Sequence, residues 1–359
     1  MPAAEPLGVY VHIPFCASRC DYCAFATWTD RPHLIDAYVD AAVAHARATF
    51  AVDPAPVTSV FFGGGTPSLI PAASLVRILA EIPLAPGAEV TVECNPETVT
   101  DELLDTYVAG GVDRVSFGVQ SMVPAVLDAL GRHHTPGTVQ AAVAAARRAG
   151  VRSFNLDLIY GGAGESVTDW ARTVDEALAL EPPHVSAYAL TVEAGTPLAA
   201  DRTRHPDDDD QADKYLVVTD RMAAAGLEWY EISNWARPGH ECRHNLLYWA
   251  QGDYHALGCA AHGHQHGRRW WNLRTPERYI DAVASGSVPE AGHEELDVDD
   301  RRIEGLQLAL RTTRGVPLDA LAIDLADPAW RELIQVEDGT ARLTVAGRLL
   351  ANEVALRLV

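Results

Sequence analysis

Short apolar runs alternate with alanine- and leucine-rich stretches along the first half of the chain. The apolar runs are rich in residue types that favour strands, and they span 9–13, 59–62, 89–93, 114–119, 153–159 and 185–190. The stretches between them predict helices over 32–50, 71–81, 101–109, 138–149 and 167–180. Strands that alternate with helices through short connections predict an α/β fold with a parallel sheet and right-handed crossovers.

Six strand–helix units are fewer than the eight of a closed (β/α)8 barrel. The alternation alone does not distinguish a partly open barrel from a doubly wound open sheet. In both architectures, ligands bind at the carboxyl ends of the strands. The residues around the end of each predicted strand are therefore the candidates for a functional site.

The pattern changes beyond residue 190. A loop over 191–197 leads to an acidic run over 207–210, which is typical of a solvated helix start because acidic side chains stabilise helix N-termini. The elements expected next are a helix over 211–225, a strand over 227–232, helices over 301–310 and 318–326, a hairpin over 333–343 that turns at Asp338-Gly339, and a last helix over 345–354. We therefore divide the chain into a main domain over 1–235, a histidine-rich connecting segment over 236–296 and a small α-rich domain over 297–359.

Composition and charge exclude several classes of function. The 359 residues are 48% hydrophobic and carry a formal net charge of −21, so non-specific binding to nucleic acid or to an anionic membrane is not expected. The chain has no long uncharged apolar run that could form a transmembrane helix, and its first six residues lack the basic and apolar regions of a signal peptide. We therefore expect a cytoplasmic protein without a nucleic-acid partner.

Three of the six cysteines, Cys16, Cys20 and Cys23, lie on one loop directly after the first predicted strand, with the spacing CxxxCxxC. In a reducing compartment such a group indicates metal binding, and thiolates favour iron–sulfur clusters or zinc. Structural zinc normally takes four protein ligands, often as two separated pairs, so three on one loop favour a [4Fe–4S] cluster with one open iron. A zinc site completed by a distant histidine or cysteine is the alternative. The other cysteines are expected to be small packing residues: Cys94, Cys242 and Cys259.

Histidines gather in the connecting segment. Six of the fourteen lie between residues 240 and 266, and histidine is a common ligand of iron, including heme iron. The alternative interpretation is that these histidines simply lie on exposed loops and bind no metal. We expect this of His262, His264 and His266.

The cysteine loop resembles that of a known family. CxxxCxxC after the first strand, with Tyr22 just before the last cysteine, resembles the radical S-adenosylmethionine (SAM) superfamily. The longer string Tyr10-Val-His-Ile-Pro-Phe-Cys16 resembles the oxygen-independent coproporphyrinogen III oxidases and their relatives, the heme chaperones of the HemW type. The resemblance implies a partial (β/α)6 barrel and a winged-helix-like domain at the C-terminus. Such a domain usually suggests DNA binding, but this one is not basic.

The resemblance also assigns residues to cofactors. The three cysteines would bind the cluster, and Tyr10 and Tyr22 would flank the cofactor. Residues near successive strand ends would line the SAM pocket: Gly64, Gly65, Thr66, Glu93, Gln120, Arg132 and Asp157. Consecutive glycines let a backbone approach a ligand closely, and a carboxylate such as Glu93 can accept hydrogen bonds from both hydroxyls of a ribose. Each residue taken alone fits an ordinary loop equally well.

Two functions are compatible with this resemblance. An oxygen-independent coproporphyrinogen III oxidase decarboxylates two propionates of its substrate through a 5′-deoxyadenosyl radical generated from SAM. A heme chaperone keeps the cluster and SAM, holds heme and delivers it to apo-hemoproteins, some of which are membrane-bound and would be contacted transiently. We assign no catalytic residue.

Three features favour the heme chaperone. The oxidase type carries a fourth cysteine two residues after the third, where this chain has Phe25, and a longer segment before its first barrel strand. The segment from His244-Asn245 to Tyr248-Trp249 matches the HNxxYW motif of the chaperone type, which the resemblance links to heme binding. His244 is the candidate axial ligand of heme iron. The alternative is a structural segment in which the two aromatic residues pack against the barrel and His244 binds a backbone carbonyl.

Overall fold

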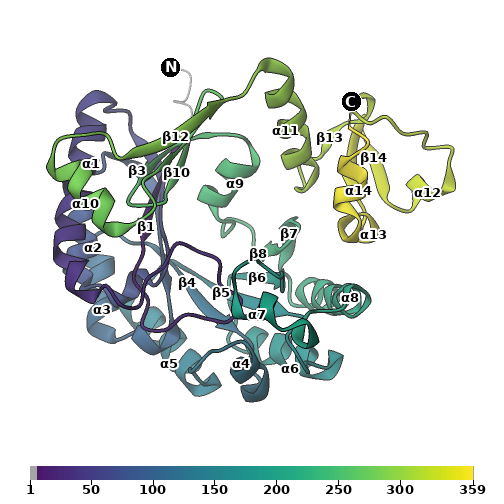
Figure 1. Cartoon of the computed structure of the whole chain (residues 1–359). Helices are drawn as coiled ribbons and strands as arrows, with labels where there is room; N and C mark the ends of the chain where they lie inside the picture. The colour runs from purple at the N-terminus through teal and green to yellow at the C-terminus, as the bar shows by residue number, and fades with distance from the viewer. Residues whose placement is uncertain (1–5, 359) are drawn as a thin grey trace.

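A curved sheet of twelve strands forms the main body of the protein in a computed structural model that describes residues 6–358 (Figure 1). The strands are β1 (Leu7–Ile13), β2 (Val57–Gly64), β3 (Leu84–Cys94), β4 (Arg114–Gln120), β5 (Ser153–Tyr160), β6 (His184–Ala189), β7 (Glu228–Glu231), β8 (Asn234–Ala236), β9 (Asp253–Leu257), β10 (His262–Gln265), β11 (Arg268–Asn272) and β12 (Glu290–Glu295). Their order in the sheet is β12-β11-β10-β9-β1-β2-β3-β4-β5-β6-β8-β7. The predicted lack of a signal peptide concerns mainly residues 1–5, which lie outside the described residues.

Strands β1 to β6 are parallel and follow one another in chain order. Six of the seven residues of β1 are buried. Strands of a parallel sheet are covered on both faces, which explains why they appear in the sequence as nearly continuous apolar runs. The predicted α/β fold with six strand–helix units is confirmed.

Helices cover the convex face of this sheet (Figure 1). They are α1 (Ile35–Val52), α2 (Ala72–Leu79), α3 (Asp101–Ala109), α4 (Pro124–Ala129), α5 (Pro136–Ala149), α6 (Val167–Leu178) and α8 (Asp208–Ala224). The short α7 (Pro197–Ala200) belongs instead to the segment after β6 that contacts the cysteine loop. Local sequence explains their ends. In α5, Thr135 caps the first turn together with Thr138, and Gly150 ends the helix at φ 76°. The six-residue α4 is not predicted, because it is too short for a periodic pattern.

The segment over 236–296 contributes strands to the same sheet. Strand β9 pairs in parallel with β1, and β10, β11 and β12 continue the sheet in antiparallel order. Helix α9 (Arg243–Trp249) lies on the concave side of the sheet, and α10 (Pro276–Ala284) packs against α1 (Figure 1). The division of the chain at residues 235 and 296 stays a prediction.

The expectation of exposed loop histidines is wrong for His264. It lies on β10 with 4% of its surface exposed, and its Nδ1 bonds the carbonyl oxygen of Gly252 at 3.0 Å. Pairing of β10 with β9 turns this side chain inward, whereas its neighbours in sequence, His262 and His266, are exposed.

A second, smaller core forms near the C-terminus. Its elements are α11 (Val298–Leu310), β13 (Val316–Pro317), α12 (Pro328–Arg331), β14 (Ile334–Glu337), β15 (Thr340–Leu343), α13 (Val345–Leu349) and α14 (Ala351–Ala355). The three strands form a separate sheet in the order β13-β15-β14. Buried residues such as Leu310, Ile334 and Val354 pack together away from the main core. The hairpin with its turn at Asp338-Gly339 is confirmed, and the winged-helix likeness stays a prediction.

Two helix predictions in this part are wrong. Only a three-residue 3-10 turn, Leu318–Ala320, replaces the helix expected over 318–326. The next residues pair instead with the chain end, because Leu321 forms a bridge with Leu358 and the amide of Ala322 donates to Arg357 O at 2.6 Å. The single helix expected over 345–354 is divided at Leu350 into α13 and α14.

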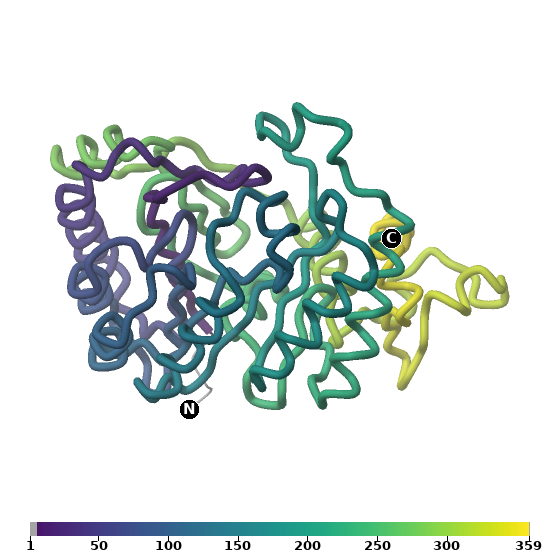
Figure 2. Tube along the Cα trace, turned by 90° about the horizontal axis from the view of Figure 1, so that it is seen from below, coloured from purple at the N-terminus to yellow at the C-terminus, as the bar shows by residue number. Residues whose placement is uncertain are grey.

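Connections that carry candidate residues rise from one end of the barrel. Figure 2 shows the segment after β1, in purple, beside the segment after β6, in teal, at the same edge. Because β1 and β6 run parallel with their neighbours, this edge is the carboxyl end of the strands. Within residues 6–358, no helix combines the length and apolarity that crossing a membrane requires.

Candidate cofactor and ligand site

The three clustered cysteines lie on the loop between β1 and α1. The loop is closed at its base by hydrogen bonds from Trp28 N to Pro14 O (2.8 Å) and from Cys16 N to Trp28 O (3.1 Å). All three cysteines are half-buried and none forms a disulfide. The loop therefore presents three free thiols at the carboxyl end of the barrel.

The surroundings of these thiols fit a negatively charged metal cluster. Burial raises the pKa of Cys16 and of Cys23, so an isolated thiolate is disfavoured at either position. The hydroxyl of Thr66, 3.6 Å from Cys16 Sγ, opposes this effect at Cys16. Nη1 of Arg132 donates a hydrogen bond to Cys20 Sγ at 3.4 Å. Cysteine thiolates that receive hydrogen bonds on sulfur are the usual ligands of iron–sulfur clusters. The residues present therefore fit the [4Fe–4S] group.

The segment after β6 clamps the cysteine loop. Arg204 Nη2 donates to Asp21 Oδ2 at 2.8 Å and to Ala129 O at 2.6 Å. The backbone amide of Leu198 donates to the carbonyl oxygen of Asp21 at 3.0 Å. Asp21 lies between the second and third cysteines, so these contacts position the part of the loop that carries both.

The glycine segment after β2 packs directly against the cysteine loop. A Cβ atom added to Gly64, at φ 109°, would lie 2.4 Å from His12 Cε1, and one added to Gly65 would lie 2.7 Å from Phe15 O. The amide of Thr66 donates to Phe15 O at 2.8 Å. The structure therefore explains these two glycines by close approach between two parts of the chain. The role of Gly64, Gly65 and Thr66 in SAM binding stays a prediction.

Glu93 lies near the end of β3 and faces the interior of the barrel. Its Oε2 accepts a hydrogen bond from the amide of Gly64 at 3.2 Å. Burial, together with the nearby charge of Asp157, raises the pKa of Glu93 to about 8. A carboxyl group with this pKa takes up a proton easily in the free protein. It gives the proton up when a bound ligand supplies hydrogen-bond donors.

Gln120 and Arg132 both lie at the end of β4, where Gln120 is the last residue of the strand and Arg132 contacts Gly118. Gln120 is 7% exposed, has φ 56°, and its Oε1 has no hydrogen-bond partner among the described residues. Arg132 Nη2 donates to Asn95 Oδ1 at 2.9 Å and to Gly118 O at 3.2 Å. A strained backbone and an unpaired buried oxygen concentrate at functional sites, which supports a ligand contact for Gln120.

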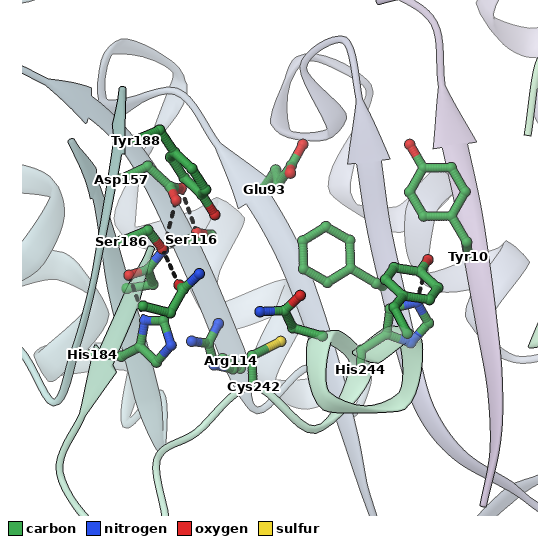
Figure 3. Close-up of a pocket in the computed structure, with 15 residues that line it drawn as sticks. Tyr10, Glu93, Arg114, Ser116, Asp157, His184, Ser186, Tyr188, Cys242 and His244 are labelled. Atoms are coloured by element: carbon green, nitrogen blue, oxygen red, sulfur yellow. Dashed lines mark hydrogen bonds between the residues drawn. The ribbon is translucent and has the colours of Figure 1, made fainter. Parts of the chain in front are cut away.

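A cavity of about 150 Å3 lies in the barrel interior (Figure 3). One wall is aromatic and consists of Tyr10, Phe61, His244 and Tyr248. The remaining lining residues are mostly polar and come from β3, β4, β5, β6, β8 and the region of α9: Glu93, Arg114, Ser116, Asn155, Asp157, His184, Ser186, Tyr188, Asn234, Cys242 and Asn245.

The cavity includes only some of the predicted site residues. Tyr10, Glu93, Asp157 and His244 line it, whereas the cysteines do not. Tyr22 packs against a small apolar cluster between loops rather than facing the cavity. Most of the polar lining was missed by sequence reasoning, because single polar residues on separate strands carry no local pattern.

His244 is enclosed by hydroxyl groups and an aromatic ring. It is 1% exposed, its Nδ1 lies 3.0 Å from Ser59 Oγ, and its Nε2 lies 2.8 Å from Tyr248 Oη. The ring stacks on Phe61 with centroids 5.6 Å apart. Burial lowers the pKa of His244 to about 3, so the ring is neutral near pH 7. Both nitrogens of His244 thus have partners within the protein, from Ser59 and Tyr248, and the alternative of a purely structural segment stays open.

Trp249 faces away from this cavity. Its ring lies under the guanidinium group of Arg311, 5.6 Å from centroid to Cζ, at the boundary with the C-terminal part. Of the two aromatic residues of the motif, only Tyr248 lines the cavity.

The partial barrel and the three-cysteine loop define a radical SAM protein. Residues 10–177 match the radical SAM superfamily. The fold is similar to that of coproporphyrinogen III oxidase from Escherichia coli, with a TM-score of 0.84, 24% identity, and coverage of 98% of this chain and 89% of that chain.

Curated relatives resemble the chain along nearly its whole length. The heme chaperone HemW of Mycobacterium tuberculosis is 42% identical, over 99% of this chain and 95% of that protein. The heme chaperone HemW of Bacillus subtilis is 33% identical, over 97% of each. The chain belongs to the HemW family.

Replacing Glu93 by Gln is expected to weaken SAM binding about tenfold or more. Hydrogen bonds to a charged group contribute roughly 1.5–3 kcal/mol each, and the amide keeps the shape of the side chain without its charge. Because the pKa of Glu93 is raised to about 8, the charged form becomes populated as the pH rises toward 8. SAM binding to the unmodified protein should therefore tighten over that range.

Equilibrium binding of SAM to anaerobic, cluster-loaded protein measures both effects. In the Glu93→Gln variant the dependence on pH should be lost, while the cluster absorbance is retained. Unchanged affinity in a folded, cluster-loaded variant would refute the assignment of Glu93.

Proposed function

We propose that this protein is a cytoplasmic heme chaperone that binds heme, carries a [4Fe–4S] cluster with SAM, and delivers heme to apo-hemoproteins. The observation that carries the proposal is its similarity, over nearly the full length, to proteins named heme chaperone. Phe25 adds support, because it is 67% exposed at the position where the oxidase type has a fourth cysteine.

The residues of the chain divide into two groups under this proposal. The cluster and SAM, when bound, supply radical chemistry, and the protein positions them. Cys16, Cys20 and Cys23 would hold the cluster, and Arg132 would stabilise the thiolate of Cys20. Glu93, Gln120 and Asp157, with the glycine segment and Tyr10, would line the SAM side. The aromatic wall around His244 offers a flat apolar surface of the kind that a macrocycle contacts.

His244 can bind iron only after a local rearrangement. In the described conformation Nε2 of His244 forms a hydrogen bond with Tyr248 Oη, and its Nδ1 forms one with Ser59 Oγ. Tyr248 lies on the cavity side, so rotation of its side chain would release Nε2. We propose that Tyr248 is displaced when heme binds, and that His244 then acts as the axial ligand.

Hemin titration of the anaerobic, cluster-loaded protein tests the function. We expect saturable binding with a defined Soret band, and transfer of the bound heme to an apo-hemoprotein. With SAM, reductant and coproporphyrinogen III, the protein should form no protoporphyrinogen IX. Robust turnover of coproporphyrinogen III without saturable hemin binding would instead identify an oxidase.

The His244→Ala variant is expected to shift the Soret band and weaken hemin binding at least about tenfold, because a metal–ligand bond is lost. Tyr248→Phe is the matched variant, since it keeps the ring but removes the hydroxyl that occupies Nε2. It should bind hemin as tightly as the unmodified protein or more tightly. If His244→Ala has an unchanged spectrum and affinity, the axial ligand is another residue, and His255, which bonds Asp53 at 3.1 Å, is the next to test.

A further inference from the structure

Arg114 is a buried cation on the floor of the cavity. It is the first residue of β4 and is 2% exposed, and Figure 3 shows its guanidinium group turned toward the cavity. Among residues 6–358, its Nε and Nη2 have no hydrogen-bond partner. Buried polar groups are almost always paired, and an unpaired buried charge is more costly still. These donors therefore require an explanation.

The nearby carboxylates are engaged by other groups. Glu89 Oε1 accepts from the amide of His244 at 3.2 Å and from the thiol of Cys242 at 3.6 Å, and its Oε2 lies 3.8 Å from Nε of Arg243. Asp157 Oδ2 accepts from Ser116 Oγ at 2.5 Å, and its Oδ1 accepts from Asn155 at 2.8 Å. Among residues 6–358, Arg114 therefore forms no direct ion pair, although the charges of Glu89 and Asp157 act on it, and the residue lines the cavity.

The size of the cavity limits what can reach Arg114. Its volume of about 150 Å3 is below the roughly 300–1,000 Å3 that is typical of pockets for whole ligands. In the described conformation this space fits a side arm of a ligand but not a macrocycle, which would contact the aromatic wall only after the proposed displacement of Tyr248. Glu93 and Asp157, which would repel an anion, lie above Arg114 in Figure 3, and Asp157 is still close enough for its charge to act on Arg114.

We propose that Arg114 binds a carboxylate on a side arm of the ligand that enters this cavity. If the ligand is heme, as the proposed function states, the arm is one propionate and the macrocycle lies against the aromatic wall above it. A guanidinium group can bind a carboxylate with two parallel hydrogen bonds, which orients the arm as well as holding it. Arg114 would thus fix which edge of the macrocycle enters the barrel.

Comparison of hemin with its dimethyl ester, in which both propionates are blocked, tests this proposal. The unmodified protein should bind hemin about tenfold to a hundredfold more tightly than the ester, as expected for hydrogen bonds between charged groups. In Arg114→Gln this preference should disappear, because hemin loses affinity while the ester does not. The control Arg172→Gln changes an exposed arginine on α6 and should keep the full preference.

Equal affinity of the unmodified protein for hemin and for the ester would overturn the proposal. So would a preference that persists in Arg114→Gln. If Arg114→Gln does not fold, the comparison of the two ligands in the unmodified protein decides by itself.

A small probe separates this proposal from the heme function. Propionate ion at millimolar concentration should raise the melting temperature of the cluster-loaded protein, and neutral propionamide should not. Arg114→Gln should remove the effect, whereas Arg172→Gln should retain it. If hemin does not bind but propionate stabilises through Arg114, the heme function fails and the carboxylate site stands. If propionate has no effect beyond that of propionamide and hemin binds no better than its ester, the carboxylate site is wrong.

Discussion

Replacement of Cys16, Cys20 or Cys23 by Ala is expected to remove most of the iron–sulfur absorbance of anaerobically reconstituted protein. The three residues are the cysteines that share the loop between β1 and α1, and in the proposed assignment each would supply one thiolate to a [4Fe–4S] cluster. With one thiolate missing, too few protein ligands remain to hold the cluster at the mouth of the barrel. Iron and sulfide content, measured together with the broad visible absorbance, checks this result.

The other three cysteines provide matched controls. Cys94, Cys242 and Cys259 are 2%, 5% and 0% exposed, which agrees with the expected packing role. Their replacement by Ala should reduce the free energy of unfolding modestly and leave the iron content unchanged. Stoichiometric zinc in place of iron, after anaerobic reconstitution of the unmodified protein, would contradict the cluster assignment.

Replacement of Lys214 by Met is expected to lower the free energy of unfolding by about 3–5 kcal/mol, as is usual when one partner of a buried ion pair is removed. Lys214 on α8 and Glu165 before α6 both have fully buried side chains, with Nζ and Oε2 3.2 Å apart. Lys214 Nζ also donates to Glu165 O at 2.7 Å. Lys214 Nζ also lies 2.6 Å from Oδ2 of the partly exposed Asp210. Met keeps the length of the side chain, so the loss reflects removal of the cation from both carboxylates.

Denaturant unfolding of Lys214→Met, Glu165→Gln and the double variant measures this effect. The double variant should lose less free energy of unfolding than the two single variants lose in sum, because neither buried charge is left without its partner. Arg172→Gln breaks an exposed pair with Glu176 and should cost less than about 1 kcal/mol. A Lys214→Met variant with the same free energy of unfolding as the unmodified protein would show that this ion pair does not stabilise the fold.

The predicted elements of the barrel are correct because their causes are local. Strand β1 is an apolar run whose residues are buried on both faces, and the start of α5 is determined by Thr135 and Pro136. Both signals lie within a few residues of the element that they specify. The spacing of the three cysteines is of the same kind, since all three ligands fall within residues 16–23.

The wrong predictions involve contacts between distant parts of the chain. The helix expected over 318–326 does not form, because Leu321 and Ala322 pair with residues 357–358. His264 is buried because β10 pairs with β9, and a histidine-rich stretch contains no sign of that pairing. In each case a tertiary contact outweighs a weak local preference.

The sequence by itself determined the alternating strands and helices, the cysteine loop and the family resemblance that implied a partial barrel, because these depend on periodicity and spacing over short distances. Only the tertiary structure brought Arg114, Asp157, His184 and His244 to one cavity, since they lie on β4, β5, β6 and α9. A polar residue buried in a strand is indistinguishable in sequence from an exposed one. What such a residue can bind depends on its neighbours in space and on which of its polar atoms are left without a partner. Both are decided by the packing of strands that are distant in sequence. The unpaired donors of Arg114, and the hydroxyl that occupies His244, exist only in that packing.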